Sequence, residues 1–280
     1  MVKFNSAWLL RKKQFRSLTG VEPGQYSRML EKLRPGWKRR VRRKNRDGRP
    51  WGVGGLEDHL LVLLILYRCH ITQDFLAVLY GVDKATICRS LRRIEKLARR
   101  MLGVKKRIVV TAEEAQQLIL DCTEQPVQRP ARKQRCWYSG KKKRHTIKNE
   151  IIVTHANAAK KCRIVAVSDD APGRVHDVTV RRRGPPLPQD AKAMADSGYQ
   201  GYQHGHPAIE LPHKKTKKNP LTRKQRKHNR SLSSRRVRVE HTIARLKSFR
   251  ILADRYRYSR AGHIVKLSIV AGIVNLAAGF

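Results

Sequence analysis

Carboxylate side chains are scarce in this sequence. In 280 residues, 21 Asp and Glu stand against 63 Lys and Arg, which gives a net charge of +42. A charge of this size calls for a polyanionic partner, and nucleic acid is the natural candidate because neutralising its phosphates releases condensed counterions. A membrane surface could attract the same charge, but the basic residues run through the whole chain instead of forming one anchoring helix.

Cysteines and long apolar runs are scarce too. The five cysteines are odd in number and scattered, and no CxxC pair exists, which argues against a disulfide framework and against a zinc finger or ribbon. The longest apolar runs, 60–67 and the tail 264–280, are expected to be too short to span a bilayer. The first residues lack the apolar core of a secretory signal. We therefore expect a cytoplasmic, nucleoid-associated protein with no membrane partner.

The chain is long enough for two modest domains, and its pattern changes near residue 104. We expect a small all-α domain over 1–104 and a domain of mixed helices and strands over 105–280. In the first domain, 15–33 is typical of a helix and 34–49 of a basic loop. The Lys and Arg residues of that loop could bind phosphates or could be a solvated charge run.

Residues 55–99 follow the plan of a helix-turn-helix unit. An apolar helix over 58–68 and a shorter one over 75–80, capped by Thr72 or Asp74, precede a turn at Gly81. The second helix of such a unit enters the major groove of DNA, but a plain helical packing unit has the same pattern. On the helix 84–93, the side chains expected to face double-stranded DNA are Lys84, Thr86, Arg89, Arg92 and Arg93.

The second domain has the pattern of strands followed by helices. After a capping box at Thr111 and Glu114, the segments 118–127, 146–154 and 163–168 are predicted to form consecutive antiparallel hairpins. A break at Pro172-Gly173, a helix at 176–181, short strands at 191–196 and 208–212, and two final helices follow. The sequence therefore predicts an α+β domain with a mixed five-stranded sheet.

Three acids occupy unusual positions. Glu240 is the one carboxylate between Leu211 and Ala253, a span with fifteen Lys and Arg, and we expect it at the edge of the buried side of its helix. Asp121 and Asp196 each follow an apolar strand-like segment. A carboxylate in such surroundings is costly without a partner, and a pair of Mg²⁺ ions would suit it.

Structural roles remain open for each of these acids. Asp121 and Asp196 could cap turns. Glu240 shares a helix face with Arg236 and Lys247, and such pairs on a surface are common and weak, about 0.3–0.5 kcal/mol each.

Several segments together form a more specific pattern. They are Asp121-Cys-Thr-Glu-Gln-Pro, Tyr138-Ser-Gly-Lys-Lys-Lys-Arg-His-Thr-Ile-Lys, Pro172-Gly-Arg-Val-His-Asp, Ala195-Asp-Ser-Gly-Tyr-Gln-Gly, and Asn229-Arg-Ser-Leu-Ser-Ser-Arg with Val239-Glu-His. Over nearly the whole chain this pattern resembles the DDE transposases of bacterial insertion sequences. The resemblance implies an RNase H-like catalytic domain in which Asp121, Asp196 and Glu240 hold Mg²⁺ or Mn²⁺, two ions in all.

The resemblance extends to residues around the acids. The family has a Tyr, Arg, Glu, Lys signature; Arg236, Glu240 and Lys247 match it in spacing, whereas Ser233 stands at the tyrosine position. Arg236 and Lys247 are thereby expected to contact DNA phosphates. His176 and Asp177 form a motif of related transposases and could support the site, although Asp177 could instead cap a helix.

The segment 137–144 offers further contacts with DNA. Lys141, Lys142 and Lys143 could follow the DNA backbone or be solvated, and Trp137 could stack on a base or belong to the core.

The function implied by the resemblance is DNA transposition. Such an enzyme cuts at the ends of its element and joins the freed 3′ hydroxyls to target DNA, as a homodimer or higher oligomer because two ends must meet. A catalytically silent DNA-binding regulator is the alternative, and the three acids argue against it. A basic RNA-binding protein of ribosomal type would explain the charge but not the acids.

Overall fold

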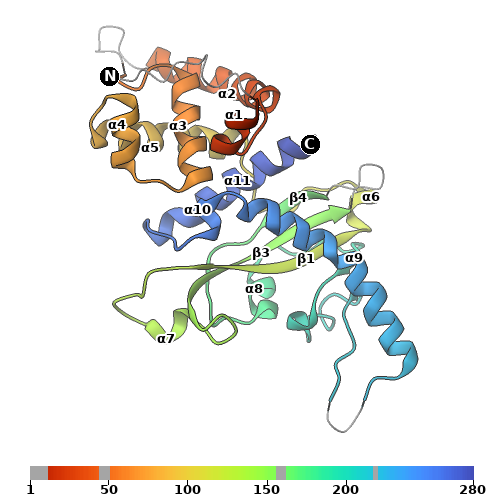
Figure 1. The fold of residues 1–280 in the computed structure, drawn as a ribbon. Helices are drawn as coiled ribbons and strands as arrows, with labels where there is room; N and C mark the ends of the chain where they lie inside the picture. The colour runs from red at the N-terminus through yellow and green to blue at the C-terminus, as the bar shows by residue number, and fades with distance from the viewer. Residues whose placement is uncertain (1–11, 44–50, 156–161, 217–219) are drawn as a thin grey trace. The chain divides into compact units, whose positions relative to one another are not determined.

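The computed structural model describes residues 12–43, 51–155, 162–216 and 220–280 (Figure 1). Contacts divide the chain into two compact units. Unit 1 comprises Met1–Gly103, Leu246–Asp254 and Arg260–Phe280, and unit 2 comprises Val104–Arg245 and Arg255–Ser259. The expected domain boundary at residue 104 stays a prediction; by contacts, the last helices of the chain belong to unit 1.

Unit 1 is helical throughout its described part. Its core is α3 (Leu56–Cys69), in which every residue from Leu60 to Tyr67 is buried. The other elements are α1 (Lys12–Thr19), α2 (Pro23–Arg43), α4 (Gln73–Tyr80), α5 (Lys84–Met101), α10 (Arg250–Ala253), η3 (Arg260–Gly262) and α11 (His263–Ala278). The predicted all-α N-terminal region is confirmed.

Helix α2 continues beyond its predicted end at residue 33. It passes through Pro35 and ends at Arg43, so it includes the first part of the predicted basic loop 34–49. The rest of that predicted loop, residues 44–49, lies outside the described residues. Met29, Leu33 and Trp37 are buried at four-residue spacing, and Gly36 packs directly against Leu97. This apolar stripe continues across Pro35, whose cost within a helix is about 3 kcal/mol.

The helix-turn-helix pattern is present in α3, α4 and α5. The Thr72 hydroxyl accepts a hydrogen bond from the Phe75 amide at 3.1 Å, so Thr72 and not Asp74 caps α4. Gly81 ends α4 in the left-handed conformation at φ 61°, a region that favours glycine. Asp83 then caps α5 by accepting from the Thr86 amide at 2.8 Å. Local cap chemistry therefore sets both helix ends.

The stretch Arg260–Ala278 is long and apolar enough to cross a membrane by length and composition alone, contrary to the expectation that the tail is too short. Within its most apolar 18-residue window, 61% of the residues are buried in the protein. Even Lys266 is buried, and its ammonium pairs with Glu95 of α5 at 3.2 Å. Burial on this scale is typical of a core helix.

Unit 2 contains a mixed sheet. Its strands are β1 (Leu118–Pro126), β2 (Tyr138–Ser139), β3 (Arg144–His155), β4 (Cys162–Val167), β5 (Ala171–Pro172), β6 (Ala193–Met194) and β7 (Ile209–Glu210). β1 pairs antiparallel with β3, and β3 with β4, as predicted. On the other edge of β1, β6 and β7 run parallel to it.

The described sheet has seven strands, so the expected number of five is wrong. The two extra strands, β2 and β5, have two residues each and both pair with β3. β5 includes Pro172, where a break in the sheet was expected. Two residues are too few to show the period-two alternation that identifies a strand in sequence.

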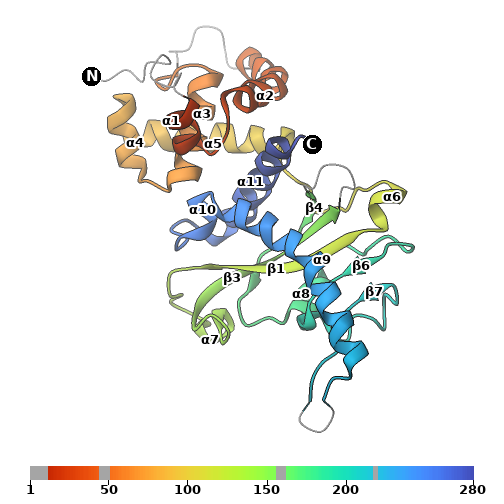
Figure 2. The same cartoon turned by 45° about the vertical axis from the view of Figure 1, so that its right-hand side comes forward.

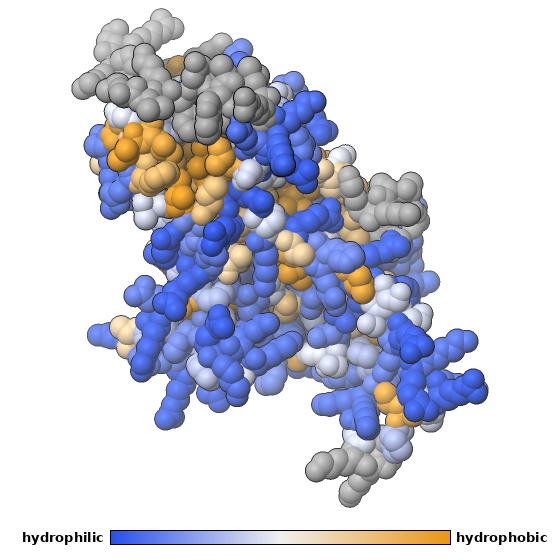
Figure 3. Space-filling model, viewed as in Figure 1, coloured by the Kyte–Doolittle hydropathy of each residue, from blue (hydrophilic) through white to orange (hydrophobic). Residues whose placement is uncertain are grey.

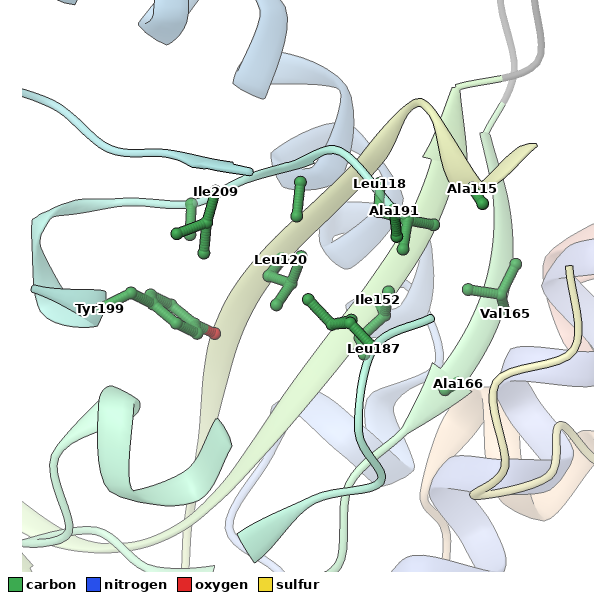
Figure 4. Close-up of a cluster of buried hydrophobic side chains, with 12 residues drawn as sticks. Ala115, Leu118, Leu120, Ile152, Val165, Ala166, Leu187, Ala191, Tyr199 and Ile209 are labelled. Atoms are coloured by element: carbon green, nitrogen blue, oxygen red, sulfur yellow. The ribbon is translucent and has the colours of Figure 1, made fainter. Parts of the chain in front are cut away.

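Helices cover both faces of this sheet (Figure 2). The helices of the described part of unit 2 are α6 (Ala112–Ala115), α7 (Gln134–Trp137), α8 (Asp177–Arg183), the single turn η2 (Ser197–Tyr199) and α9 (Arg223–Lys247). Alternate residues of a strand point to opposite faces. Leu118, Leu120 and Ile152 point to one face and pack with Leu187 and Tyr199 (Figure 4). Asp121 consequently belongs to the opposite face, where Figures 1 and 2 both place α9.

Candidate active site

Asp121 lies in the middle of β1 with its side chain 20% exposed. Its Oδ1 accepts a hydrogen bond from the amide of Cys122 at 2.9 Å and stands 3.8 Å from Nη2 of Arg236 on α9. Burial raises the pKa of Asp121 to about 6; the positive charge of Arg236 lowers it, and the negative charges of Asp196 and Glu240 raise it further. Asp121 therefore responds to both other acids of the expected triad.

Asp196 follows β6, the parallel neighbour of β1. Ile119 of β1 is in register with Met194 of β6, and each aspartate stands two residues further along its strand direction. The two carboxylates thus leave neighbouring strands at the same level of the sheet. Asp196 also caps the η2 turn by accepting from the Gly198 amide at 2.8 Å. The cap role and a role beside Asp121 are therefore compatible.

Glu240 projects from α9, one helical turn after Arg236. It is exposed, so the expectation that it sits at the edge of the buried side is wrong. The buried side of α9 runs through Leu232, Val239 and Thr242, and Glu240 lies about 100° around the helix from Val239. This position on the helix leaves the Glu240 carboxylate accessible to solvent and to ligands.

The three acids share the chemistry of a hard-cation site, because carboxylate oxygens are the ligands that Mg²⁺ prefers. Among the residues that the structure describes, no three Asp, Glu, His or Cys side chains stand close enough together to hold a metal ion. The triad of Asp121, Asp196 and Glu240 therefore stays a prediction. What supports it is the electrostatic influence of both other acids on Asp121.

Arg236 is placed between the sheet and the solvent. Its side chain is 13% exposed, and its Nε is buried without a hydrogen-bond partner among the described residues. Its guanidinium faces Asp121. Lys247, the other cation of the signature, is the half-buried last residue of α9, and Ser233 is exposed.

His176 and Asp177 open α8 beside the site. His176 occupies the cap position without a side-chain hydrogen bond, so the alternative of capping by Asp177 is wrong. Oδ1 of Asp177 instead accepts from Nζ of Lys148 at 2.8 Å, and Lys148 also stands 3.5 Å from Glu124. A Cβ built on Gly198 would lie 2.6 Å from Oδ2 of Asp177 and 3.0 Å from Oδ1 of Asp196. Asp177 therefore contacts the turn that carries Asp196.

Two partners in this network were not anticipated. Lys148 is buried in the middle of β3, and Arg181 of α8 is fully buried against Glu150, with Nη1 2.7 Å from Oε2. The signal for Lys148 was a single cation within the apolar strand 146–154. Nothing in the sequence singled out Arg181 among the three arginines that end α8.

The residues expected to face DNA from unit 1 lie on α5. Lys84 and Arg89 are exposed at its start, where Lys84 pairs with Asp74 at 2.9 Å and Arg89 donates to the Thr86 hydroxyl at 3.0 Å. Arg92 is exposed one turn later, whereas Arg93 is half-buried with its guanidinium 5.0 Å from the centre of the Trp51 ring. DNA contact by these side chains stays a prediction.

In unit 2 the basic tip of the β2–β3 hairpin is exposed as expected. Lys141, Lys142 and Lys143 lie in its turn, and Lys143 has φ 52°. Trp137 packs against Val127, Ile147 and Tyr256, so the core alternative for Trp137 is confirmed.

Two regions of the chain match known protein families. Residues 120–278 match the family model of the DDE superfamily endonucleases, and residues 54–103 match the helix-turn-helix of the same superfamily. A protein of Microchaete diplosiphon named "Probable transposase for insertion sequence element IS702" is 28% identical over 98% of both chains. A protein of Streptomyces albus G named "Putative transposase for insertion sequence element IS112" is 26% identical over 84% of both. The chain belongs to the DDE superfamily endonucleases and carries their helix-turn-helix region.

Proposed function

We propose that this protein is a DNA transposase that cuts at the ends of its insertion sequence and joins the freed 3′ hydroxyls to target DNA. The observation that carries the proposal is the position of Asp121: it stands two residues beyond the Ile119–Met194 pair on β1, as Asp196 does after β6, and its pKa is raised by burial and by the charges of Asp196 and Glu240. Both relatives are named as transposases for insertion sequences. The strand order β4, β3, β1, β6, β7 around the acids supports an RNase H-like domain.

Asp121, Asp196 and Glu240 would hold Mg²⁺ or Mn²⁺, in a pair of ions. Such ions, when bound, activate a water or sugar hydroxyl and stabilise the leaving oxygen of an in-line phosphoryl displacement. The protein itself contributes one carboxylate from β1, one from the turn that follows β6 and a third from α9. Arg236 holds Asp121 in place before DNA binds and is close enough to the acids to contact a phosphate afterwards.

Basic side chains elsewhere in the chain would bind double-stranded DNA. The exposed cations of α5 would read the element's ends, and Lys141 to Lys143 together with Lys247 would follow the backbone. Two ends must be brought together, so the active form is at least a homodimer. Its place of action would be the bacterial nucleoid.

The test is cleavage of a labelled duplex made from the DNA that flanks this gene, with Mg²⁺ or Mn²⁺, beside the Glu240→Gln variant. Discrete metal-dependent cuts by the wild type and none by the variant would support the proposal and locate the ends. Equal cutting by both proteins would remove Glu240 from the mechanism. If neither cuts but both bind the flanking DNA tightly, the protein is a silent DNA-binding regulator.

A further inference from the structure

An open surface pocket of about 520 Å³ lies in unit 2 around α7 and the base of the β2–β3 hairpin. It involves neither the expected acids nor the lysines at the tip of the hairpin. Its volume is within the range of small-ligand sites, about 300–1,000 Å³. We call it the Tyr138 pocket, and the residues that line it are Arg129, Gln134, Arg135, Tyr138, Gly140, His145 and Arg174.

Two of the residues that line the Tyr138 pocket, Tyr138 and His145, carry aromatic rings. Trp137, the last residue of α7, packs against the core, whereas the next residue, Tyr138, which begins β2, is 42% exposed. His145 pairs with Tyr138 across the hairpin, and the two rings meet nearly edge to face, with centroids 5.6 Å apart at 74°. His145 thus fixes the orientation of the Tyr138 ring and leaves part of its surface free for a ligand.

Three arginines also line the pocket. Arg129, Arg135 and Arg174 are exposed around the pocket, and Nε of Arg129 is held by Oε1 of Gln134 at 2.8 Å. None of the three arginines forms an ion pair with an acid in the described part of the chain. By contrast, Arg163, Arg181 and Arg236 of the same unit each face a carboxylate. Unpaired guanidinium groups beside an aromatic ring suit a ligand that is both flat and anionic.

A nucleotide has both properties, because its base stacks on an aromatic ring and its phosphate binds arginine. In an intact duplex each base is stacked between its neighbours and cannot reach such a ring. We propose that the Tyr138 pocket binds one unpaired nucleotide of a DNA strand, with the base against Tyr138 and the phosphate against the arginines. The choice of DNA as ligand rests on the proposed function. The surface over α7 is hydrophilic in Figure 3, as expected of a site for a charged strand.

The experiment measures binding of fluorescein-labelled ten-residue oligodeoxythymidine and of a blunt duplex by anisotropy, in EDTA and about 200 mM salt. Stacking of one base on an aromatic side chain accounts for about 1–3 kcal/mol. Tyr138→Ala should therefore weaken binding of the single strand by roughly tenfold and leave duplex binding unchanged. Tyr138→Phe keeps the ring and should bind within about twofold of the wild type.

Two charge variants distinguish the pocket from general attraction. Arg135→Gln should reduce the salt dependence of single-strand binding by about 0.7, the share of one phosphate contact. Lys142→Ala, at the hairpin tip, should weaken single-strand and duplex binding alike. Unchanged single-strand binding by Tyr138→Ala, or an equal loss for Tyr138→Phe, overturns the proposal, as does a loss of duplex binding by Tyr138→Ala.

The assay contains no metal and measures no cutting, so it is independent of the proposed nuclease. If Tyr138→Ala has the expected effect on binding but the wild type never cuts its flanking DNA, the proposal for the Tyr138 pocket stands and the transposase proposal is wrong. If the wild type cuts its flanking DNA but Tyr138→Ala does not change single-strand binding, the transposase proposal stands and the proposal for the Tyr138 pocket is wrong.

Discussion

Replacing Asp121 with asparagine should stabilise the metal-free protein near neutral pH. The carboxylate is 20% exposed, and burial raises its pKa from 3.8 to about 6. A raised pKa means that ionising this carboxyl group costs more free energy in the folded protein than in the unfolded chain. The difference of about two pH units corresponds to about 3 kcal/mol at 1.36 kcal/mol per unit. Asparagine has a similar shape and no charge, so it removes this cost.

The pH dependence has a defined sign. Below about pH 4 the folded and unfolded states both hold the proton, and Asp121 contributes no difference. Between pH 4 and 6 the unfolded state releases its proton first, so the wild type loses stability relative to the variant as pH rises. Above pH 6 the difference is constant.

Thermal unfolding in EDTA at pH 7.5 and pH 4 measures this effect. For a domain of this size, about 3 kcal/mol raises Tm by roughly 6–12 °C. The matched control is Asp196→Asn, because an amide oxygen can still accept the hydrogen bond of the Gly198 amide, and Tm should change little. The reasoning fails if Asp121→Asn leaves Tm at pH 7.5 unchanged or lowers it.

Three further changes have defined outcomes. Arg181→Met should cost about 3–5 kcal/mol of unfolding free energy in urea because it leaves Glu150 buried and uncompensated, and adding Glu150→Gln should recover most of the loss. If the double variant recovers none of the lost unfolding free energy, Arg181 stabilises the fold by packing and not by its charge. Gly198→Ala places a methyl group 3.0 Å from Oδ1 of Asp196 and should abolish cutting while the protein stays folded; wild-type cutting would exclude a role for this turn. Arg92→Ala should weaken duplex binding and lower its salt dependence by about 1, and an unchanged salt dependence removes Arg92 from the DNA interface.

Features with local causes could be predicted from the sequence. The antiparallel run of β1, β3 and β4 follows from apolar segments separated by turns, and the caps at Thr72 and Thr111 follow from side-chain chemistry within three residues. The family match confirms the DDE endonuclease and its helix-turn-helix. The position of Asp121 opposite α9 also follows once the register of β1 is known.

Features that depend on tertiary packing could not be predicted. α2 continues through Pro35 with Met29 and Trp37 buried on either side of the proline, and the Trp37 ring centroid lies 4.8 Å from that of Trp51. Lys148 and Asp177 are 29 residues apart, and no local pattern brings them together. Glu240 is exposed because the buried side of α9 is centred near Val239 and Thr242, which depends on how the helix lies on the sheet.

Exposed apolar surface is another feature set by packing. Phe75 and Val78 of α4 are 54% and 80% exposed, and Figure 3 shows apolar surface in this part of unit 1. In the sequence both residues belong to the segment 75–80, which was predicted only as a helix. Leu76 and Ala77 occupy the buried positions of α4 instead.

The central claim is that Asp121, Asp196 and Glu240 form one metal site. Its most direct measurement is Mn²⁺ binding followed by the loss of the free-ion electron paramagnetic resonance signal, for the wild type and for Asp121→Asn, Asp196→Asn and Glu240→Gln. The claim predicts binding by the wild type and at least tenfold weaker binding by each variant. Binding by Glu240→Gln that equals the wild type, with loss in the two aspartate variants, would contradict a site of three acids; equal binding by all four proteins would contradict the site altogether.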